Sequence, residues 1–288
     1  MLLKLLPLTL LLGSLNLSCQ NAEFKGVEKN NAEVCESGEV YTGANFLFLV
    51  DNSRSMIDTD CPSGDSANCG PTNRERAILS AFDALTEAFV SSDRDEAISS
   101  IAIARFTPDN RNQSFEDMPA ESYISVESFP ENRSMLEQRL SFTRSPKGDT
   151  PYLNAILWGE KFVSEETSAN GRKNILVLVT DGEPTDKSPK EVREKAESLD
   201  APIITIRVNQ SGLNMEQRRD IHQGVIQKNY SQWTTENYDN LNLYVDDLMS
   251  LPQDISSREI IEISSVAELE AKIFQDIILE TVPCLPSK

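Results

Sequence analysis

The sequence predicts an α/β protein in which a doubly wound, mainly parallel six-stranded sheet is flanked by helices. Short apolar runs such as residues 46–50 and 175–180 have the length and unbroken hydrophobicity of strands that are buried on both faces. These runs alternate with longer segments of helical periodicity, an order that favours right-handed crossovers between parallel strands. The composition, 39% hydrophobic and 25% charged, is that of a single globular domain with a substantial core.

The first part of the domain is a strand, a polar loop and a helix. The strand is expected over 46–50. The loop over 58–73 is rich in Asp, Ser, Gly and Pro, which are turn residues. Thr72, with Glu75 three residues later, forms an N-cap pattern ahead of a periodic apolar run, so a helix is expected over 72–90.

Two strands and two helices follow. The apolar run over 100–106 is typical of a buried strand, whereas the alternation of polar and apolar residues over 123–129 predicts a strand at the edge of the sheet. A short helix is expected over 132–142. A longer helix is expected over 152–166, after a loop that contains Gly and Pro.

The next repeat of the pattern is a strand over 175–180, a helix over 188–199 and a strand over 202–208. Asp186 precedes the helix and is expected to cap it, because Asp is a preferred N-cap residue.

The last part of the chain is less regular. Residues 241–251 fit either a helix or a strand followed by a turn. A strand over 259–263 and an amphipathic helix over 266–281 complete the domain. The apolar residues of that helix recur at helical spacing, which indicates a face turned toward the core.

Oxygen-bearing side chains follow two of these strands. Asp51, Ser53 and Ser55 alternate directly after the first strand, and Asp181 follows the fourth. Thr150 stands just before a helix. The carboxyl ends of parallel strands meet at one edge of an open α/β sheet, where ligands bind. A carboxylate and hydroxyls gathered there suit a hard divalent cation such as Mg²⁺.

This combination resembles the von Willebrand factor type A (VWA) domain. In that family an Asp-x-Ser-x-Ser motif, a loop Thr and a later Asp-Gly form the metal-ion-dependent adhesion site. The resemblance covers roughly residues 44–283 and implies a single VWA/Rossmann-like domain, which we assign to 44–284 with a short tail over 285–288. Residues 209–258 are then an elaboration near the metal face.

The resemblance also implies roles for the five site residues. Ser53, Ser55 and Thr150 would contact the metal directly, while Asp51 and Asp181 would act mostly through water. The expected ion is Mg²⁺, with Mn²⁺ or Ca²⁺ possible. An Asp or Glu carboxylate of a protein partner would fill the open coordination position, because neutral hydroxyl ligands leave the cation electrophilic.

The amino terminus has the pattern of a bacterial lipoprotein. Residues 1–18 place a lysine ahead of an apolar segment that is too short to span a bilayer, as in a secretory signal peptide. Cys19 resembles the lipidated cysteine of a lipobox, although Asn16 departs from the usual residue there. Cleavage by the general signal peptidase is the alternative. Gln20 is similar to outer-membrane sorting signals, and 19–43 would form a polar tether in the cell envelope.

The remaining four cysteines can pair in an oxidising compartment, and four cysteines allow three connectivities. In the VWA family the two ends of the domain lie close together, which implies a Cys35–Cys284 bridge. Cys61 and Cys69 would then close the loop after Ser55. A zinc site is disfavoured because the cysteines lack metal-ligand spacing and the chain has a single His.

The formal net charge of −19 limits the classes of molecule that the chain is expected to bind. Nucleic-acid binding is disfavoured, because its general affinity comes from Lys and Arg neutralising phosphates. Membrane attachment would come from the lipid anchor only, and the oligomeric state stays open. Asp58, Asp60 and Asp65 could hold a second cation, but a solvated acidic loop is the expectation.

The preferred function is a cell-envelope lipoprotein that binds a protein partner through the cation, in adhesion or envelope assembly. A structural lipoprotein whose metal serves stability alone is the alternative. A metal-dependent hydrolase is disfavoured, because no constellation supplies a general base and His222 has no recognisable nucleophile partner. We therefore expect no enzymatic activity.

Overall fold

The computed structural model describes residues 39–41, 43–60, 70–92, 95, 98–106, 123–146, 150–170, 172–182, 188–209, 213–229, 240–263 and 284–286. The signal peptide, Cys19, the closing helix expected over 266–281 and the cysteines Cys35, Cys61 and Cys69 lie outside these residues. No helix in the described ranges is long and apolar enough to cross a bilayer.

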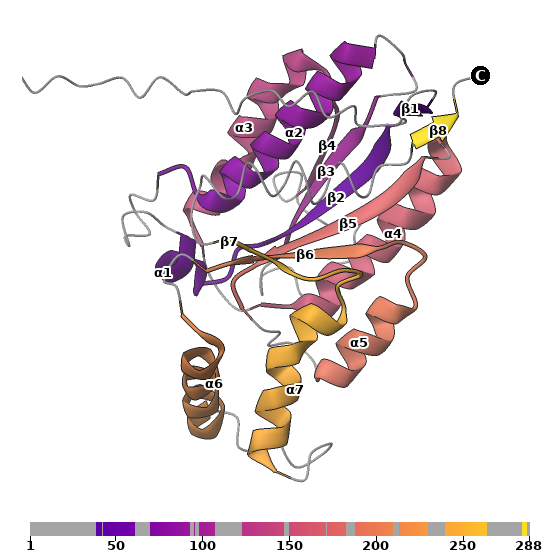
Figure 1. Ribbon diagram of the computed structural model, residues 1–288. Helices are drawn as coiled ribbons and strands as arrows, with labels where there is room; N and C mark the ends of the chain where they lie inside the picture. Colours follow the sequence, from indigo (N-terminus) through magenta and orange to yellow (C-terminus); the bar gives the residue numbers. More distant parts are fainter. Residues whose placement is uncertain are drawn as a thin grey trace, which may run out of the picture. The chain divides into compact units, whose positions relative to one another are not determined.

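The main sheet has six strands in the order β4-β3-β2-β5-β6-β7 (Figure 1). All neighbours are parallel except β4, which pairs antiparallel with β3 at the edge. The strands are β2 (Ala44–Asp51), β3 (Ser100–Phe106), β4 (Tyr123–Glu127), β5 (Lys173–Thr180), β6 (Ile203–Val208) and β7 (Ile261–Ile263). The predicted fold class and the edge position of the third predicted strand are confirmed.

The helices alternate with these strands. They are α1 (Met56–Asp60), α2 (Asn73–Ser92), α3 (Arg133–Leu140), α4 (Tyr152–Asn170), α5 (Pro189–Glu197), α6 (Met215–Asn229) and α7 (Leu241–Asp254). The helix expected over 132–142 is α3 between two 3-10 turns, η4 (Pro130–Asn132) and η5 (Ser141–Arg144). The loop expected from residue 58 begins later, because α1 extends to Asp60.

Two helix caps define where α2 and α5 begin. The Thr72 hydroxyl accepts from the Glu75 N–H at 3.2 Å, as the sequence predicted. At α5 the cap is Ser188, which forms a reciprocal capping box with Glu191. The N-cap position is therefore held by Ser188 and not by Asp186, which lies outside the described residues.

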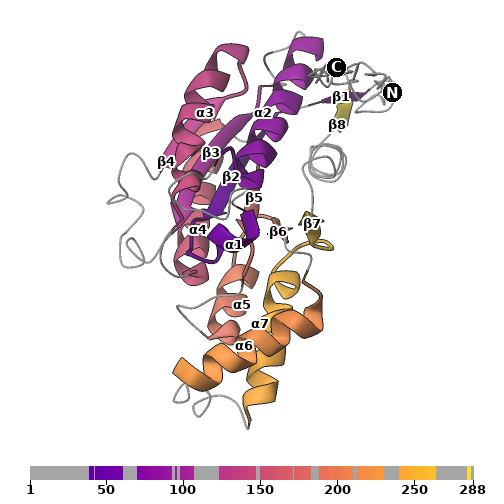
Figure 2. The same ribbon diagram turned by 90° about the vertical axis from the view of Figure 1, so that its left-hand side faces the viewer.

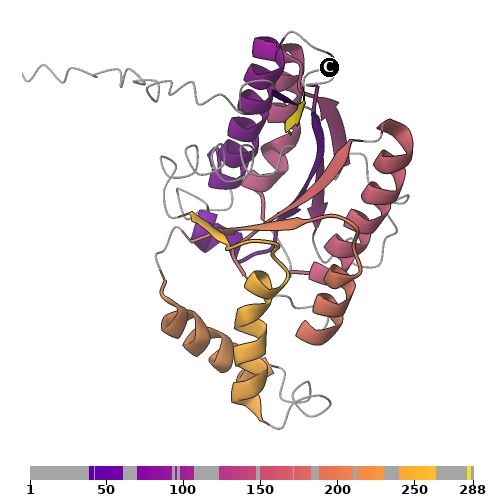
Figure 3. The ribbon, with the colours of Figure 1, turned by 45° about the vertical axis from the view of Figure 1, so that its right-hand side comes forward.

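Side chains alternate between the two faces of the sheet, so each central strand contributes to two apolar clusters. On one face, Phe46 and Phe48 of β2 belong to the cluster that α2 and α3 cover. On the other face, Leu47 and Leu49 pack with α4, α5 and the carboxyl end of α7. The ribbons of α4 and α5 lie along one side of the sheet (Figure 3). Burial on both faces explains why these strands have unbroken apolar sequences.

The described part of residues 209–258 contains α6 and α7, so 241–251 is helical. The two helices cross one another (Figure 2) and share a small apolar cluster that contains Ile226 of α6 and Tyr244 and Leu248 of α7. The Arg219–Asp246 ion pair, with Nε 2.9 Å from Oδ1, joins their exposed faces. The amino-terminal part of α7 therefore packs on α6, while its last turn reaches the main sheet through Leu251.

A second, two-stranded sheet joins the ends of the domain. β1 (Glu39–Tyr41) pairs antiparallel with β8 (Cys284–Pro286), and Tyr41 lies opposite Cys284. β1 lies within the segment assigned to the tether, and β8 extends into the segment assigned to the tail.

Where the chain enters β2, Gly43 passes so close to Ile98 that a Cβ atom would lie 1.7 Å from its carbonyl oxygen. Only glycine fits this close approach.

Candidate metal centre

The candidate site lies at the carboxyl ends of β2 and β5, which are adjacent and parallel (Figure 1). Asp51 is the last residue of β2, and Asp181 directly follows β5. Between Asp51 and the start of α1, the chain turns through Ser53 and Ser55. The sheet topology therefore brings the two parts of the predicted motif together at one edge, which is where open α/β sheets bind ligands.

Hydroxyl and carboxylate oxygens form a continuous chain across this edge. The Ser53 and Ser55 hydroxyls are 2.9 Å apart, and the Ser55 hydroxyl donates to Asp181 Oδ1 at 2.9 Å. The Ser53 N–H donates to Asp51 Oδ1 at 2.7 Å, which closes the turn after β2. Four of the five predicted site residues, Asp51, Ser53, Ser55 and Asp181, are thus linked by hydrogen bonds.

Asp51 is fully buried beneath this chain of oxygens. Its Oδ2 accepts from the Thr180 hydroxyl at 2.6 Å. Burial raises the pKa of Asp51 above its ordinary value, against the opposing effect of hydrogen bonds from Thr180 and Ser53 and of the Arg74 charge. The environment of Asp51 therefore penalises the ionised carboxylate unless further positive charge is present.

Asp181 is buried as well, and its carboxylate accepts hydrogen bonds from Ser55 and Thr59. Burial, followed by repulsion from Asp51, raises the pKa of Asp181 to about 7. Two buried carboxylates that repel each other, beside two hydroxyls, form a donor set that a divalent cation would satisfy. The residues present therefore fit a hard metal ion.

Thr150 is buried at the start of the segment that leads into α4. Two residues later, the Tyr152 hydroxyl donates to the carbonyl oxygen of Gly182 at 2.5 Å. This bond fastens the amino end of α4 to the turn after β5. Thr150 therefore belongs to the same edge of the sheet as Asp181.

Several residues that the sequence did not predict hold the site together. Thr59, one helical turn after Ser55, donates to Asp181 Oδ2 and at 3.2 Å to the Ser55 carbonyl oxygen. The Thr180 hydroxyl donates a hydrogen bond to the Asp51 carboxylate and so helps to fix its orientation. The spacing from Ser55 to Thr59 is a helical one that could have been noticed in the sequence, but the helix there was expected to be a loop.

Arg74 anchors the site from below and is completely buried. Its Nε lies 2.5 Å from Asp60 Oδ2, and Asp60 is also fully buried. Its other nitrogens donate to the Asp51 carbonyl oxygen and, at 2.8 Å, to the Thr143 carbonyl oxygen. Asp60 is therefore not part of a solvated acidic loop, as the sequence suggested, because Arg74 compensates its charge inside the fold.

The elaboration over 209–258 reaches the site through Arg218 of α6. Its guanidinium donates to the carbonyl oxygen of Asp181. Arg218 is buried, so α6 is held against the turn that carries Asp181. The predicted position of this segment near the metal face agrees with this contact.

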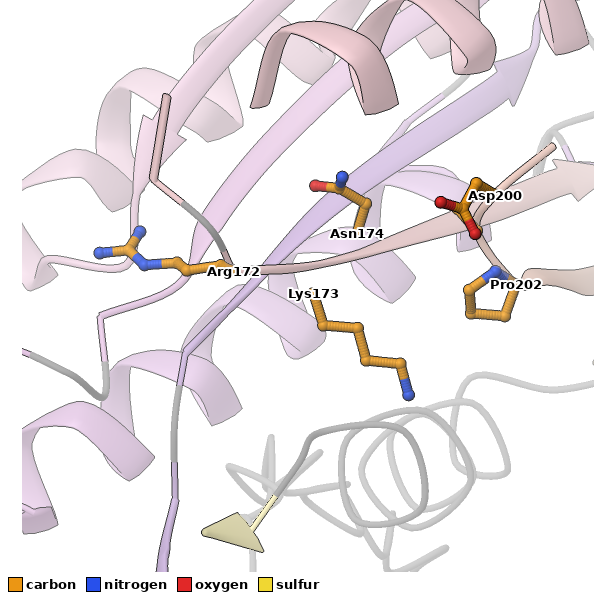
Figure 4. A pocket seen from close by; sticks show the side chains of 6 residues that line it. Arg172, Lys173, Asn174, Asp200 and Pro202 are labelled. Carbon is orange, nitrogen blue, oxygen red and sulfur yellow. The ribbon is translucent and has the colours of Figure 1, made fainter. Parts of the chain in front are cut away.

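A hollow of about 460 Å³ lies at the other end of the sheet (Figure 4). Its lining comes from the starts of β5 and β6, and includes Lys173, Asn174 and Asp200. The side chains of Arg172 and Lys173 extend in different directions there. None of the predicted site residues contributes to it.

The raised pKa of Asp181 predicts opposite effects of pH on two quantities. In the metal-free protein, the folded state keeps the Asp181 carboxyl protonated at pH values where the unfolded chain has already released that proton. The free energy of unfolding should therefore fall as pH rises from about 4 to about 7, by up to about 1.4 kcal/mol per pH unit from this group. Mg²⁺ affinity should rise over the same interval, because the cation favours the ionised carboxylate.

Urea unfolding with chelator and with excess Mg²⁺ at several pH values would measure both effects. The stabilisation by Mg²⁺ should grow from pH 5 to pH 8. In Asp181→Asn that growth should be much smaller, because only Asp51 then releases a proton when the ion binds. A stabilisation independent of pH in the wild-type protein would contradict a metal beside Asp181.

Comparison with known proteins gives one family match. The sequence model of the von Willebrand factor type A domain matches residues 45–253. No protein in the curated set matches the chain.

Solved structures with a similar fold include the pilus adhesin SpaC from Lactobacillus rhamnosus GG. Its open conformation gives a TM-score of 0.48 and another form 0.50, at 13% identity over 82% of this chain and 30% of SpaC. Manganese-loaded TRAP protein from Plasmodium vivax gives a TM-score of 0.39 at 18% identity, over 64% of each chain. The likeness to SpaC concerns the fold, and the chain spans less than a third of that adhesin.

Proposed function

Because the chain belongs to the von Willebrand factor type A domain family, we propose that it is a binding module that attaches to a protein partner through a divalent cation. The observation that carries this proposal is the chain of oxygens from Ser53 through Ser55 to Asp181, beside the buried Asp51. Asp51, Ser53, Ser55, Thr150 and Asp181 would hold the ion.

The bound ion would supply an electrophilic position for an anionic group of the partner. The chain's own residues prepare that position. Ser53 and Ser55 offer neutral hydroxyls, which leave more positive charge for a ligand than direct carboxylates would. Thr59 and Arg218 fix the side chain and the backbone of Asp181, so that its carboxylate is oriented before a ligand arrives.

The partner we propose is a protein that offers an Asp or Glu carboxylate. With 46 acidic residues against 27 basic ones, this chain favours a partner whose metal-binding acid is surrounded by basic residues. We further propose that Cys19 carries lipid and holds the protein in a bacterial cell envelope, at the outer membrane.

A purely structural metal is the second candidate. The observation that favours it is the burial of Asp51 and Asp181, since any cation there would stabilise the fold whether or not a partner binds. We propose binding rather than catalysis, since the oxygen chain offers ligands for a metal but no separate general base.

A pull-down from envelope extracts, with Mg²⁺ or with chelator, tests the binding proposal. We expect a partner to be retained with Mg²⁺, lost with chelator, and lost in Thr150→Ala. Ser134→Ala removes an exposed hydroxyl on α3 and serves as the control that should retain the partner. Mg²⁺ binding by calorimetry is measured alongside for each variant.

The result decides between the two candidates. Retention of the same proteins with chelator and in Thr150→Ala would exclude metal-mediated binding. If Mg²⁺ then still raised the melting temperature, the metal would be structural.

A further inference from the structure

Arg207 is a buried arginine in the same row of the sheet as the metal site. It lies opposite Thr180 in the pairing of β6 with β5, and Thr180 supports Asp51. Adjacent strands lie about 4.8 Å apart. The backbone of Arg207 is therefore one strand spacing from Thr180, the residue directly before Asp181. Only 3% of Arg207 is exposed. Its guanidinium is thus inside the protein near the edge that carries the candidate metal centre.

The Arg207 guanidinium contacts a sulfur rather than a carboxylate. Within the described part of the chain, it hydrogen-bonds to Met215 Sδ, at 3.6 Å. Glu262 lies opposite Arg207 on β7, but its carboxylate accepts from the Asn209 side chain instead. A sulfur is a weak acceptor, and a buried cation without an anionic partner is costly.

The surroundings of Arg207 add positive charge. Met215 is the first residue of α6, and the amino end of a helix carries partial positive charge. Arg218 lies one turn further along the same face of α6, where its guanidinium meets the backbone of Asp181. Met215 itself is 51% exposed, so solvent reaches the side chain that covers Arg207.

We propose that Arg207, with Arg218 and the first turn of α6 beside it, binds a second carboxylate of the same protein partner. This inference rests on the proposed function. The chain has 46 acidic residues, yet among the described residues the Arg207 guanidinium donates its hydrogen bond to a sulfur. This points to an anion that another molecule supplies. The planar guanidinium binds a carboxylate through two parallel hydrogen bonds. Met215 moves aside when the carboxylate enters, as an unbranched side chain can.

The positions of the two sites suggest the sequence that the partner presents. The metal-binding oxygens lie at the ends of β2 and β5, and Arg207 lies on β6, so the sites are about one to two strand spacings apart, or about 5 to 10 Å. In an extended peptide, side chains two residues apart point the same way and lie about 7 Å apart. An Asp-x-Asp segment therefore matches both sites.

Two short peptides test the proposed carboxylate site at Arg207, with the full-length protein in the presence of Mg²⁺. Acetyl-Asp-Gly-Asp-amide and acetyl-Asp-Gly-Asn-amide differ in one charged group, and calorimetry gives the affinity of each. We expect the wild type to bind the first about tenfold more tightly, as for a charge-assisted hydrogen bond. Arg207→Gln should lose this preference, and Arg207→Lys should lose most of it, since Lys lacks the planar fork.

Arg219→Gln is the matched control, because Arg219 is on the same turn of α6 as Arg218 but pairs with Asp246 on the exposed face. It should keep the tenfold preference. Thermal melting of every variant shows whether it is folded. Because Arg207→Lys keeps the charge, it stays informative if Arg207→Gln fails to fold.

A second measurement separates this inference from the proposed function. Acetate is titrated in the presence of chelator, where the metal cannot contribute. Acetate should raise the melting temperature of the wild type and Arg219→Gln but not of Arg207→Gln or Arg207→Lys. If this effect is seen while Mg²⁺ gives no peptide binding, the metal proposal fails and the Arg207 site stands. An equal peptide preference and an equal acetate effect in wild type and both Arg207 variants would overturn the site.

Discussion

Asp51→Asn is expected to lower the Mg²⁺ affinity by about 100-fold. This is the upper end of the range for residues that orient the metal ligands without contacting the metal themselves. In the absence of metal, the same change should raise the free energy of unfolding at pH 8. Asp51 is completely buried and burial raises its pKa, so ionising it costs stability that a neutral amide does not lose. The amide oxygen of the variant can still accept from the Ser53 N–H. Calorimetry and urea unfolding in chelator measure the two effects.

The control for this variant is Asp200→Asn, which removes an exposed carboxylate at the far end of the sheet. The Mg²⁺ affinity and the free energy of unfolding of Asp200→Asn should both stay close to the wild-type values. A variant Asp51→Asn with wild-type metal affinity would show that the metal, if bound, lies elsewhere. Reduced stability of that variant in chelator would contradict the charge penalty at Asp51.

Arg74→Met should lower the free energy of unfolding by about 3 to 5 kcal/mol, because it leaves Asp60 as a buried, uncompensated carboxylate. Burial already raises the pKa of Asp60, and the charge of Arg74 is the main effect that opposes this rise. The variant also loses the bonds from Arg74 to the carbonyl oxygens of Asp51 and Thr143, which fix the metal-site turn. Denaturant unfolding measures the loss.

The double variant Arg74→Met with Asp60→Asn separates charge from packing. It should recover a large part of the lost stability, because removing both charges of a buried pair is far less costly than removing one. The side-chain amide that replaces the Asp60 carboxylate would still accept from the Asn73 N–H at the start of α2. If the two changes were simply additive, the ion pair would not be the reason for the instability of Arg74→Met.

Most of the fold could be predicted because strands buried on both faces have a distinctive sequence. The grouping of Asp51, Ser55 and Asp181 follows from the same pattern, since the ends of parallel strands meet at one edge. The residues that hold the site are different. Asp60 and Arg74 are separated by a polar segment without periodicity, and an acidic loop in a chain of this charge suggests solvent exposure.

Other features gave no usable signal. The pairing of β1 with β8 involves three residues on each side, without an apolar run, so only the family resemblance suggested that the ends meet. Arg207 occupies a position in a correctly predicted strand, but periodicity does not reveal whether a buried arginine has found a partner. Contacts between residues far apart in the sequence depend on side-chain packing, which a single sequence does not show.

The central position of β2 has a mechanical consequence. Its carboxyl end carries the metal-site turn, and its amino end leads toward the proposed lipid anchor. A pull on the metal site would enter the sheet at the ends of both β2 and β5, so the part that enters through Asp181 would reach β2 by loading the hydrogen bonds between β5 and β2 in shear. Bonds loaded in this way share the force and must break together, whereas bonds at a peeled edge break one after another. An attachment that takes force at Asp181 would therefore fail only when many of the hydrogen bonds between β5 and β2 break together.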